Sequence, residues 1–220
     1  MLPDMLTYTI DNFFPHIQGT PNEKIVLMFE EIVERTAHTV ALWQCYGFCH
    51  GVLNTDNMSI LGLTIDYGPF GFLEHFNPDH ICNHSDNEGR YKYSAQPEIC
   101  LFNLEILAQA LEPLLPQDKS MPNLSKNFWK AYHETYDSLM ARKFGLTVEK
   151  EHEHSPDEAA LIKEFFKCME LTSNDMTNTF RQLASVNSTE ESAFLNNILS
   201  HAASKEIKLN RTVSKWAGNE

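Results

Sequence analysis

The apolar positions of the chain recur with the spacing of an α-helix over most of its length. Residues 21–46 start with Pro21 and place apolar residues three and four apart from Ile25 to Leu42, which predicts one long amphipathic helix. This helix is expected to end near Tyr46, just before a glycine. The same spacing predicts further helices at residues 99–114, 124–144, 156–171, 174–185 and 189–203. The chain is therefore expected to be mainly α-helical.

The two ends of the chain do not show this period. Residues 1–20 are aromatic and contain proline, and they are predicted to form an N-terminal loop. Residues 204–220 are polar and are predicted to form a flexible tail. The one domain expected from this pattern spans residues 21–203.

The helical pattern also breaks within residues 48–98. Residues 58–61 and 63–65 are two short apolar runs that meet at Gly62, and they predict a tight β-hairpin. Residues 69–96 have little periodicity and are rich in Gly, Asn, Asp, His and aromatic residues, which predicts a long ordered loop. Loops of this length inside a compact domain are usually functional, so we expect the chemistry of the chain here.

Three polar side chains flank the predicted hairpin. Asp56 and Asn57 come directly before it, and Asp66 comes directly after it. Because a hairpin brings its two ends together, Asn57 and Asp66 are expected to lie within a few ångströms of each other. An amide oxygen and a carboxylate suit Mg²⁺, which completes its shell with water and phosphate oxygens, and Asp56 could orient or deprotonate a hydroxyl. The alternative is that both motifs are ordinary turns.

The order of these motifs follows the C-terminal lobe of a protein kinase. His50 stands seven residues before Asn57, which is the spacing of a kinase catalytic loop. Residues 66–68 (Asp-Tyr-Gly) stand where the metal-binding motif would be, and residues 96–98 (Gln-Pro-Glu) stand where the activation segment would end. Val52 departs from the pattern, because a kinase has its catalytic aspartate at that position. Read as a kinase, the chain is a pseudokinase, and phosphoryl transfer is disfavoured.

Charge and cysteine content narrow the classes of function. The chain has 30 acidic and 17 basic residues, a net charge of −13, which disfavours binding of nucleic acid through a basic face. No run of about 18 apolar residues occurs, so no membrane span is expected. The five cysteines fit no zinc-binding spacing and are expected to be mostly buried thiols. Arg90 is expected to hold its loop through a carboxylate, and contact with a phosphate is the alternative.

Part of the sequence resembles a known family. Three stretches carry a close resemblance to the signature of the selenoprotein O family: residues 50–72, 82–98 and 103–111. The resemblance is specific across residues 43–111 and extends over most of residues 20–200. It implies the helical C-terminal lobe of a protein-kinase-like fold, with a short β-hairpin at the metal site. Its catalytic loop would be residues 48–57, and its activation-like segment residues 69–98.

The resemblance also implies an activity. Members of this family bind ATP in a flipped orientation and transfer AMP, instead of phosphate, to Ser, Thr or Tyr hydroxyls of proteins. By resemblance, Asp56 is the proposed base, while Asn57 and Asp66 hold Mg²⁺ and the bound ATP. ATP and protein substrates are then the partners of the chain. Cys82 matches a family cysteine associated with redox control through a cysteine near the C-terminus, and a packed loop thiol is the alternative.

The N-terminal lobe of such a fold is not visible in the sequence. Residues 1–20 are too few to hold a Gly-rich loop, a strand lysine and its glutamate partner. Two functional interpretations therefore remain open. The chain is a Mg²⁺-dependent protein adenylyltransferase, alone or completed by another chain. Alternatively it is a truncated, non-catalytic family member or gene fragment that acts at most as an interaction module, and it then exposes apolar area where the missing lobe would pack.

The resemblance gives one expectation about location. Eukaryotic members of the family are mitochondrial, which implies a mitochondrial location for this chain. A cytoplasmic location is expected instead if no transit peptide lies upstream.

Overall fold

The computed structural model describes residues 2–115, 123–145 and 156–183. The predicted helix at 189–203 and the predicted tail at 204–220 lie outside the described residues. The chain is mainly helical, with one small antiparallel sheet. The elements follow in the order α1 (Leu2–Phe13), α2 (Pro21–Tyr46), β1 (Phe48–Cys49), β2 (Gly71–Phe72), α3 (Gln96–Leu111), α4 (Leu124–Lys143), α5 (Pro156–Thr172) and α6 (Met176–Leu183), with 3₁₀ turns at Thr55–Asn57, Tyr93–Ala95 and Glu112–Leu114.

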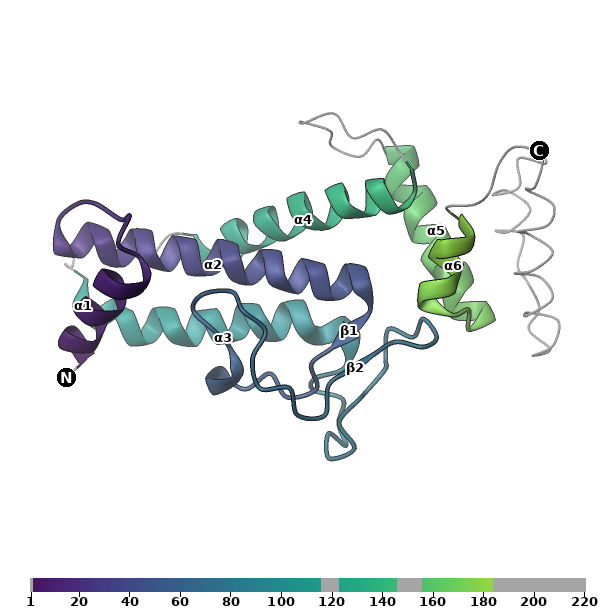
Figure 1. Cartoon of the computed structure of the whole chain (residues 1–220), viewed down its shortest axis with the longest axis horizontal. Coiled ribbons are helices and arrows are strands. Elements are labelled where there is room, and N and C mark those ends of the chain that lie inside the picture. The colour runs from purple at the N-terminus through teal and green to yellow at the C-terminus, as the bar shows by residue number, and fades with distance from the viewer. Residues whose placement is uncertain (1, 116–122, 146–155, 184–220) are drawn as a thin grey trace.

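Helix α2 is the centre of the molecule, and its ends were predicted correctly. Thr20 and Glu23 form a reciprocal capping box at its start, which satisfies backbone N–H groups that have no partner inside the helix. Gly47 ends the helix with a left-handed φ of 71°. Helices α3 and α4 run alongside α2 on two sides, while α1 lies near one end of it and α5 and α6 near the other (Figure 1).

The main core lies between α2 and its two long neighbours. Phe29 and Val40 of α2 are fully buried, and they belong to one apolar cluster with Leu104 of α3 and Phe128 of α4. Side chains three, four, seven or eleven residues apart lie on the same face of a helix, so α2 buries a broad apolar stripe. The residues after α2 therefore start from a rigid support.

The expectation of an N-terminal loop at residues 1–20 was wrong, because Leu2–Phe13 form helix α1. Leu6 and Ile10, which are four residues apart, are buried in the main core cluster. Thr7 and Thr9 direct their hydroxyls back to carbonyl oxygens four residues earlier, which keeps these polar groups satisfied within the helix. The apolar pair at i and i+4 was the signal in the sequence, but the aromatic residues around it obscured the period.

The hairpin predicted at residues 58–61 and 63–65 was also wrong, because neither run forms a strand. Ser59 accepts a turn hydrogen bond from the backbone N–H of Gly62 at 3.0 Å. The segment then bonds to α2: the Trp43 indole N–H donates to the Thr64 hydroxyl at 2.9 Å. The apolar side chains of its first run, Met58, Ile60 and Leu61, pack on the main core, while Leu63 and Ile65 of the second run are exposed. Packing of the first run on the core therefore replaces the expected strand pairing.

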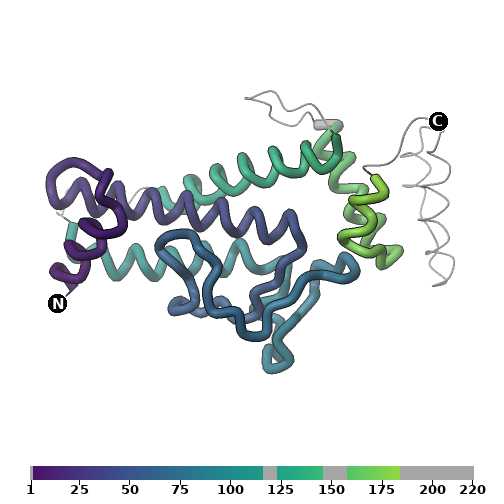
Figure 2. The backbone as a smooth tube through the Cα atoms, in the orientation of Figure 1, coloured from purple at the N-terminus to yellow at the C-terminus, as the bar shows by residue number. Residues whose placement is uncertain are grey.

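The observed strands lie outside the predicted hairpin on both sides and enclose it in a longer loop. Strands β1 and β2 pair antiparallel, with Phe48 opposite Phe72 and Cys49 opposite Gly71. The tube in Figure 2 shows the chain leaving α2, passing through a long loop and returning beside β1. Asp56, Asn57 and Asp66 consequently lie inside one loop that is fixed at its base.

The long loop after β2 is ordered, as predicted, and it is hydrogen-bonded to residues that come much later in the chain. The Phe76 backbone N–H donates to the Asn174 carbonyl at 3.0 Å, and the Met176 N–H donates to the Glu74 carbonyl at 2.8 Å. These bonds join the start of the loop to the turn between α5 and α6. No helix in the described ranges is long and apolar enough to cross a bilayer.

Gly62 provides a test of how the loop lies on α2. It has a left-handed φ of 68°, and a Cβ atom there would lie 2.8 Å from the Arg35 Cβ and 3.0 Å from the Arg35 carbonyl oxygen. Gly145 has the same φ, and a Cβ there meets no described atom within 4 Å. We expect Gly62→Ala to lower the free energy of unfolding by at least ~1 kcal/mol more than Gly145→Ala, because only Gly62→Ala adds a steric clash to the backbone strain. Urea unfolding followed by circular dichroism measures both, and equal losses would contradict this contact.

Candidate active site

Asp56 and Asn57 lie on the 3₁₀ turn Thr55–Asn57, at the end of the predicted catalytic loop. The Asp56 side chain is exposed, and Asn57 is half-buried. The Asn57 Nδ2 donates to the Val52 carbonyl at 2.9 Å. This bond fixes the amide so that its nitrogen faces the loop, and the Oδ1 oxygen is left as the atom available to a metal ion.

Asp66 has an unusual backbone. Its φ is 55°, and it shares this positive value with only one other non-glycine residue in the described part, Ser173. Aspartate tolerates the left-handed region better than most residues, yet the conformation carries strain. The Gly68 N–H donates to the Asp66 carbonyl at 2.8 Å, which makes residues 66–68 a tight turn. The turn leaves the Asp66 side chain exposed.

His50 connects this turn to the catalytic loop. Its ring is buried, and its Nε2 lies 2.8 Å from the carbonyl oxygen of Ile65, the residue before Asp66. Because a carbonyl only accepts, Nε2 carries the proton in this bond, and Nδ1 faces the Val52 N–H at 3.4 Å. Residues 50–52 therefore hold both parts of the candidate site. The His50 ring binds the residue before Asp66, and the Val52 carbonyl binds Asn57.

Two buried amides on α3 hold the catalytic loop from below. Gln96 is fully buried: its Oε1 accepts from the His50 N–H at 2.8 Å, and its Nε2 donates to the Phe48 carbonyl at 2.9 Å. The Asn103 Nδ2 donates to the Leu53 carbonyl at 2.9 Å. Sequence reasoning named Gln96 only as the end of the activation segment and missed both roles. Polar residues on the buried side of an apolar helix were the signal that could have revealed them.

The structure thus places all three predicted site residues around one short backbone segment. Asn57 is tied to residue 52, and the residue before Asp66 is tied to residue 50, while Asp56 stands exposed beside Asn57. One amide oxygen and one carboxylate fit the donor set that Mg²⁺ takes from proteins. Residues 2–115, 123–145 and 156–183 contain no group of three or more His, Cys, Asp or Glu that could hold a metal alone. A metal ion here would therefore depend on further ligands such as phosphate oxygens and water.

An exposed group of aromatic side chains borders Asp66. Tyr67, Phe70 and Phe72, here called the aromatic rim, pack around Phe48 with ring centroids 6.2, 6.0 and 5.4 Å from its ring. Their exposed fractions are 57%, 43% and 64%. A group of this size on the surface marks a place where another apolar surface packs. The chain therefore exposes apolar area next to the Asp-Tyr-Gly turn.

Cys82 lies beneath the catalytic loop. Its thiol donates to the Cys49 carbonyl at 3.5 Å, and a Cβ atom on Gly51 would come within 2.6 Å of its sulfur. Burial, and secondarily the neighbouring Cys82, raises the pKa of the Cys49 thiol to about 12. Both thiols are free and packed, as the packed-thiol alternative expects.

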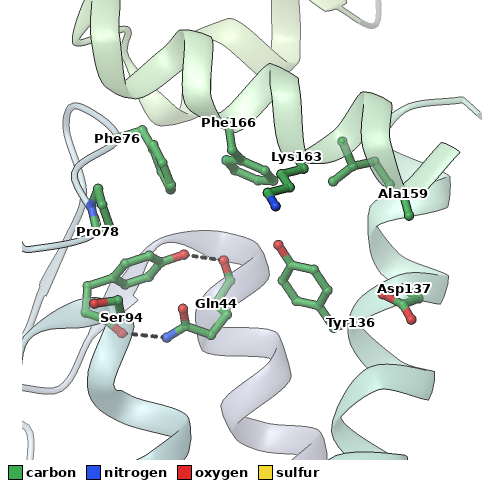
Figure 3. Close-up of a pocket in the computed structure, with 11 residues that line it drawn as sticks. Gln44, Phe76, Pro78, Ser94, Tyr136, Asp137, Ala159, Lys163 and Phe166 are labelled. Atoms are coloured by element: carbon green, nitrogen blue, oxygen red, sulfur yellow. Dashed lines mark hydrogen bonds between the residues drawn. The ribbon is translucent and has the colours of Figure 1, made fainter. Parts of the chain in front are cut away.

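A separate cavity lies away from these residues. It has a volume of about 380 Å³, and the side chains of Tyr136 from α4 and Lys163 from α5 point into it (Figure 3). A pair of hydrogen bonds between Gln44 and Tyr93 closes one side. Neither Asp56, Asn57 nor Asp66 lines the cavity. The cavity is therefore not part of the site built on the catalytic loop.

The buried Gln96 gives a test of the support below the site. Gln96→Leu keeps the side-chain size but leaves the Phe48 carbonyl and the His50 N–H without partners in a buried place. We expect the free energy of unfolding to fall by about 2–4 kcal/mol, because each buried unpaired group costs about 1–3 kcal/mol. Gln109→Leu, an exposed change on the same helix, should stay within about 0.5 kcal/mol of the parent. Chemical denaturation of both variants measures this, and similar small losses in both would contradict the role of Gln96.

Comparison with known proteins gives the relatives of this chain. The family model described as protein adenylyltransferase SelO matches residues 1–219. The mitochondrial protein adenylyltransferase SelO-1 of Danio rerio is 52% identical over 185 residues, which cover 83% of this chain and 26% of the relative. The mitochondrial protein adenylyltransferase SelO of Mus musculus is 47% identical over 211 residues, or 92% of this chain and 31% of the relative.

A bacterial relative is also similar. The protein nucleotidyltransferase YdiU of Cronobacter sakazakii is 42% identical over 181 residues, which cover 82% of this chain and 36% of the relative. The chain thus spans between 26% and 36% of the length of these three relatives. Because the family model matches almost every residue and the identities lie near one half, the chain belongs to the SelO protein adenylyltransferase family.

Proposed function

We propose that this chain carries the metal-binding and hydroxyl-activating part of a Mg²⁺-dependent protein adenylyltransferase, which moves AMP from ATP to a Ser, Thr or Tyr hydroxyl of a protein. The observation that carries the proposal is the anchoring of Asn57 and of the Asp66 turn on residues 50–52. This arrangement presents an amide oxygen and a carboxylate around one backbone segment. The printed names of the relatives, protein adenylyltransferase and protein nucleotidyltransferase, support the type of reaction.

The proposed fold is the C-terminal lobe of a protein-kinase-like enzyme. Its support is the order of elements: a long helix, a catalytic loop, the Asp-Tyr-Gly turn, a long ordered loop and then helix α3. Gln96 is the first residue of α3 and binds back to the start of the catalytic loop. The end of the activation-like segment is thereby held against the site, which is where a substrate-binding segment is required.

In the proposed reaction, the hydroxyl oxygen of the target protein attacks the α-phosphorus of ATP. The bond between the α-phosphorus and the bridging oxygen breaks, and pyrophosphate leaves. Asp56 orients the hydroxyl and accepts its proton, since Val52 cannot act as a base. Asn57 and Asp66 would hold Mg²⁺, and the bound ion would neutralise charge on the triphosphate.

A non-catalytic role is the second candidate. The aromatic rim favours it, because exposed rings beside the site show that this part of the surface is suited to packing against another segment. A chain without such a segment would retain the ligands but bind the nucleotide weakly. The mitochondrial location follows only from the names of the animal relatives and remains part of the proposal, with the cytoplasm as the alternative.

The test is transfer of label from ATP carrying the label on either the α- or the γ-phosphate, in the presence of Mg²⁺. It is made with the 220-residue chain and with a fusion that places the N-terminal region of the Mus musculus relative before it. We expect transfer from the α-position only, and a loss of about 100-fold or more in Asp66→Asn, because charge stabilisation at the phosphates fails. Asp11→Asn, an exposed change on α1, should leave transfer unchanged.

Each outcome has a defined meaning. Transfer from the γ-position would overturn the proposal in favour of a kinase with an unusual base. Activity in the fusion alone would show that the chain needs a second segment over its site. Absence of transfer from both proteins would support the non-catalytic role.

A further inference from the structure

The region of the site contains very few positive charges. Within residues 48–98 the only lysine or arginine side chains are Arg90 and Lys92. The Lys92 ammonium pairs with the Asp79 carboxylate at 2.7 Å. Arg90 is therefore the one cationic side chain of this region without a carboxylate partner among the described residues.

This result corrects the expectation that Arg90 holds its loop through a carboxylate. The loop is held by the backbone instead, because the Asp86 carboxylate accepts from the Arg90 N–H at 2.9 Å and from the Tyr91 N–H at 2.8 Å. The Arg90 guanidinium is exposed and lies between two rings, 5.7 Å from the centre of Tyr91 and 5.6 Å from that of Phe102. Contact with two rings limits the motion of the guanidinium, and no described carboxylate binds its N–H groups.

The position of Arg90 relative to the catalytic loop is fixed by its neighbours. The Tyr91 hydroxyl donates to the Asn54 Oδ1 at 2.5 Å, and Asn54 directly precedes the 3₁₀ turn that carries Asp56. On the other side, Phe102 is next to Asn103, which binds the Leu53 carbonyl. Arg90 thus stands beside the Asp56 end of the loop.

The surface around Arg90 is partly apolar. Phe102 and Ile106 are one helical turn apart on α3, and they are 43% and 37% exposed. A guanidinium with a free edge beside exposed apolar side chains suits a peptide segment that combines a carboxylate with an apolar residue. A nucleotide phosphate would use the guanidinium but not the apolar surface.

We propose that Arg90, held between Tyr91 and Phe102, docks an acidic side chain of the protein substrate close to the hydroxyl that is modified. This inference rests on the proposed function and names the substrate class, a hydroxyl-bearing segment with a nearby acidic residue. With a net charge of −13, the chain repels acidic segments over most of its surface. Within residues 48–98, Arg90 is therefore the side chain that would distinguish an acidic peptide from a neutral one.

The experiment measures binding without ATP, so that it does not depend on catalysis. Fluorescent peptides with a Ser, Thr or Tyr and a nearby Asp are compared with matched peptides in which Asn replaces the Asp, by fluorescence anisotropy. We expect the acidic peptides to bind about tenfold more tightly, as for one charged, two-pronged hydrogen bond. Arg90→Gln should abolish this preference, and Arg142→Gln, an exposed arginine at the end of α4, should keep it.

A second arm separates the protein substrate from the nucleotide. In an adenylylation assay of the fusion protein, Arg90→Gln should raise the KM for the acidic peptide and leave the KM for ATP unchanged. An unchanged peptide preference in Arg90→Gln overturns the inference, and so does a raised KM for ATP alone, which would assign the guanidinium to a phosphate. A preference for acidic peptides that is present in the parent protein and lost in Arg90→Gln, together with no AMP transfer by the parent fusion, would instead reject the proposed function and keep Arg90 as an acidic-peptide site.

Discussion

The buried amide of Gln96 is the interaction on which the rest of the site depends. It satisfies a carbonyl in β1 and the N–H of His50 at the same time, in a place that water does not reach. His50 in turn fixes the turn that carries Asp66. A buried hydrogen bond is expensive to leave unmade, so one side chain on α3 determines the course of the backbone on both sides of the loop.

The helices were the part of the fold that the sequence could predict. Both ends of α2 follow from local chemistry, a capping box at Thr20 and a glycine at residue 47, and neither depends on distant contacts. Helix α1 was missed because its evidence is a single buried pair, Leu6 and Ile10, whose burial depends on the core of other elements. The hairpin at residues 58–65 was predicted from two short apolar runs that meet at Gly62, but the first run packs on the main core and the second is exposed, so no strands form.

The candidate site was predicted by residue type and order, and its geometry was not. Asp56, Asn57 and Asp66 were identifiable because their order and their spacing from His50 follow the catalytic loop and metal-binding motif of a kinase. Their supports, Gln96 and Asn103, lie about fifty positions away along the chain from the groups they bind. Their place on the buried side of an apolar helix marks them as buried polar residues, but it does not identify their partners. Arg90 was expected to hold its loop through a carboxylate, but among the described residues Asp86 binds the backbone N–H groups of residues 90 and 91 instead of the guanidinium.

The left-handed backbone conformation of Asp66 raises the question of why this position holds an aspartate and not a glycine. A position with a φ of 55° that only had to turn the chain would be more stable as glycine, by an amount on the order of 1 kcal/mol. The chain accepts that loss of stability and retains an acid. The proposed metal site would give the Asp66 carboxylate a role that a glycine could not fill.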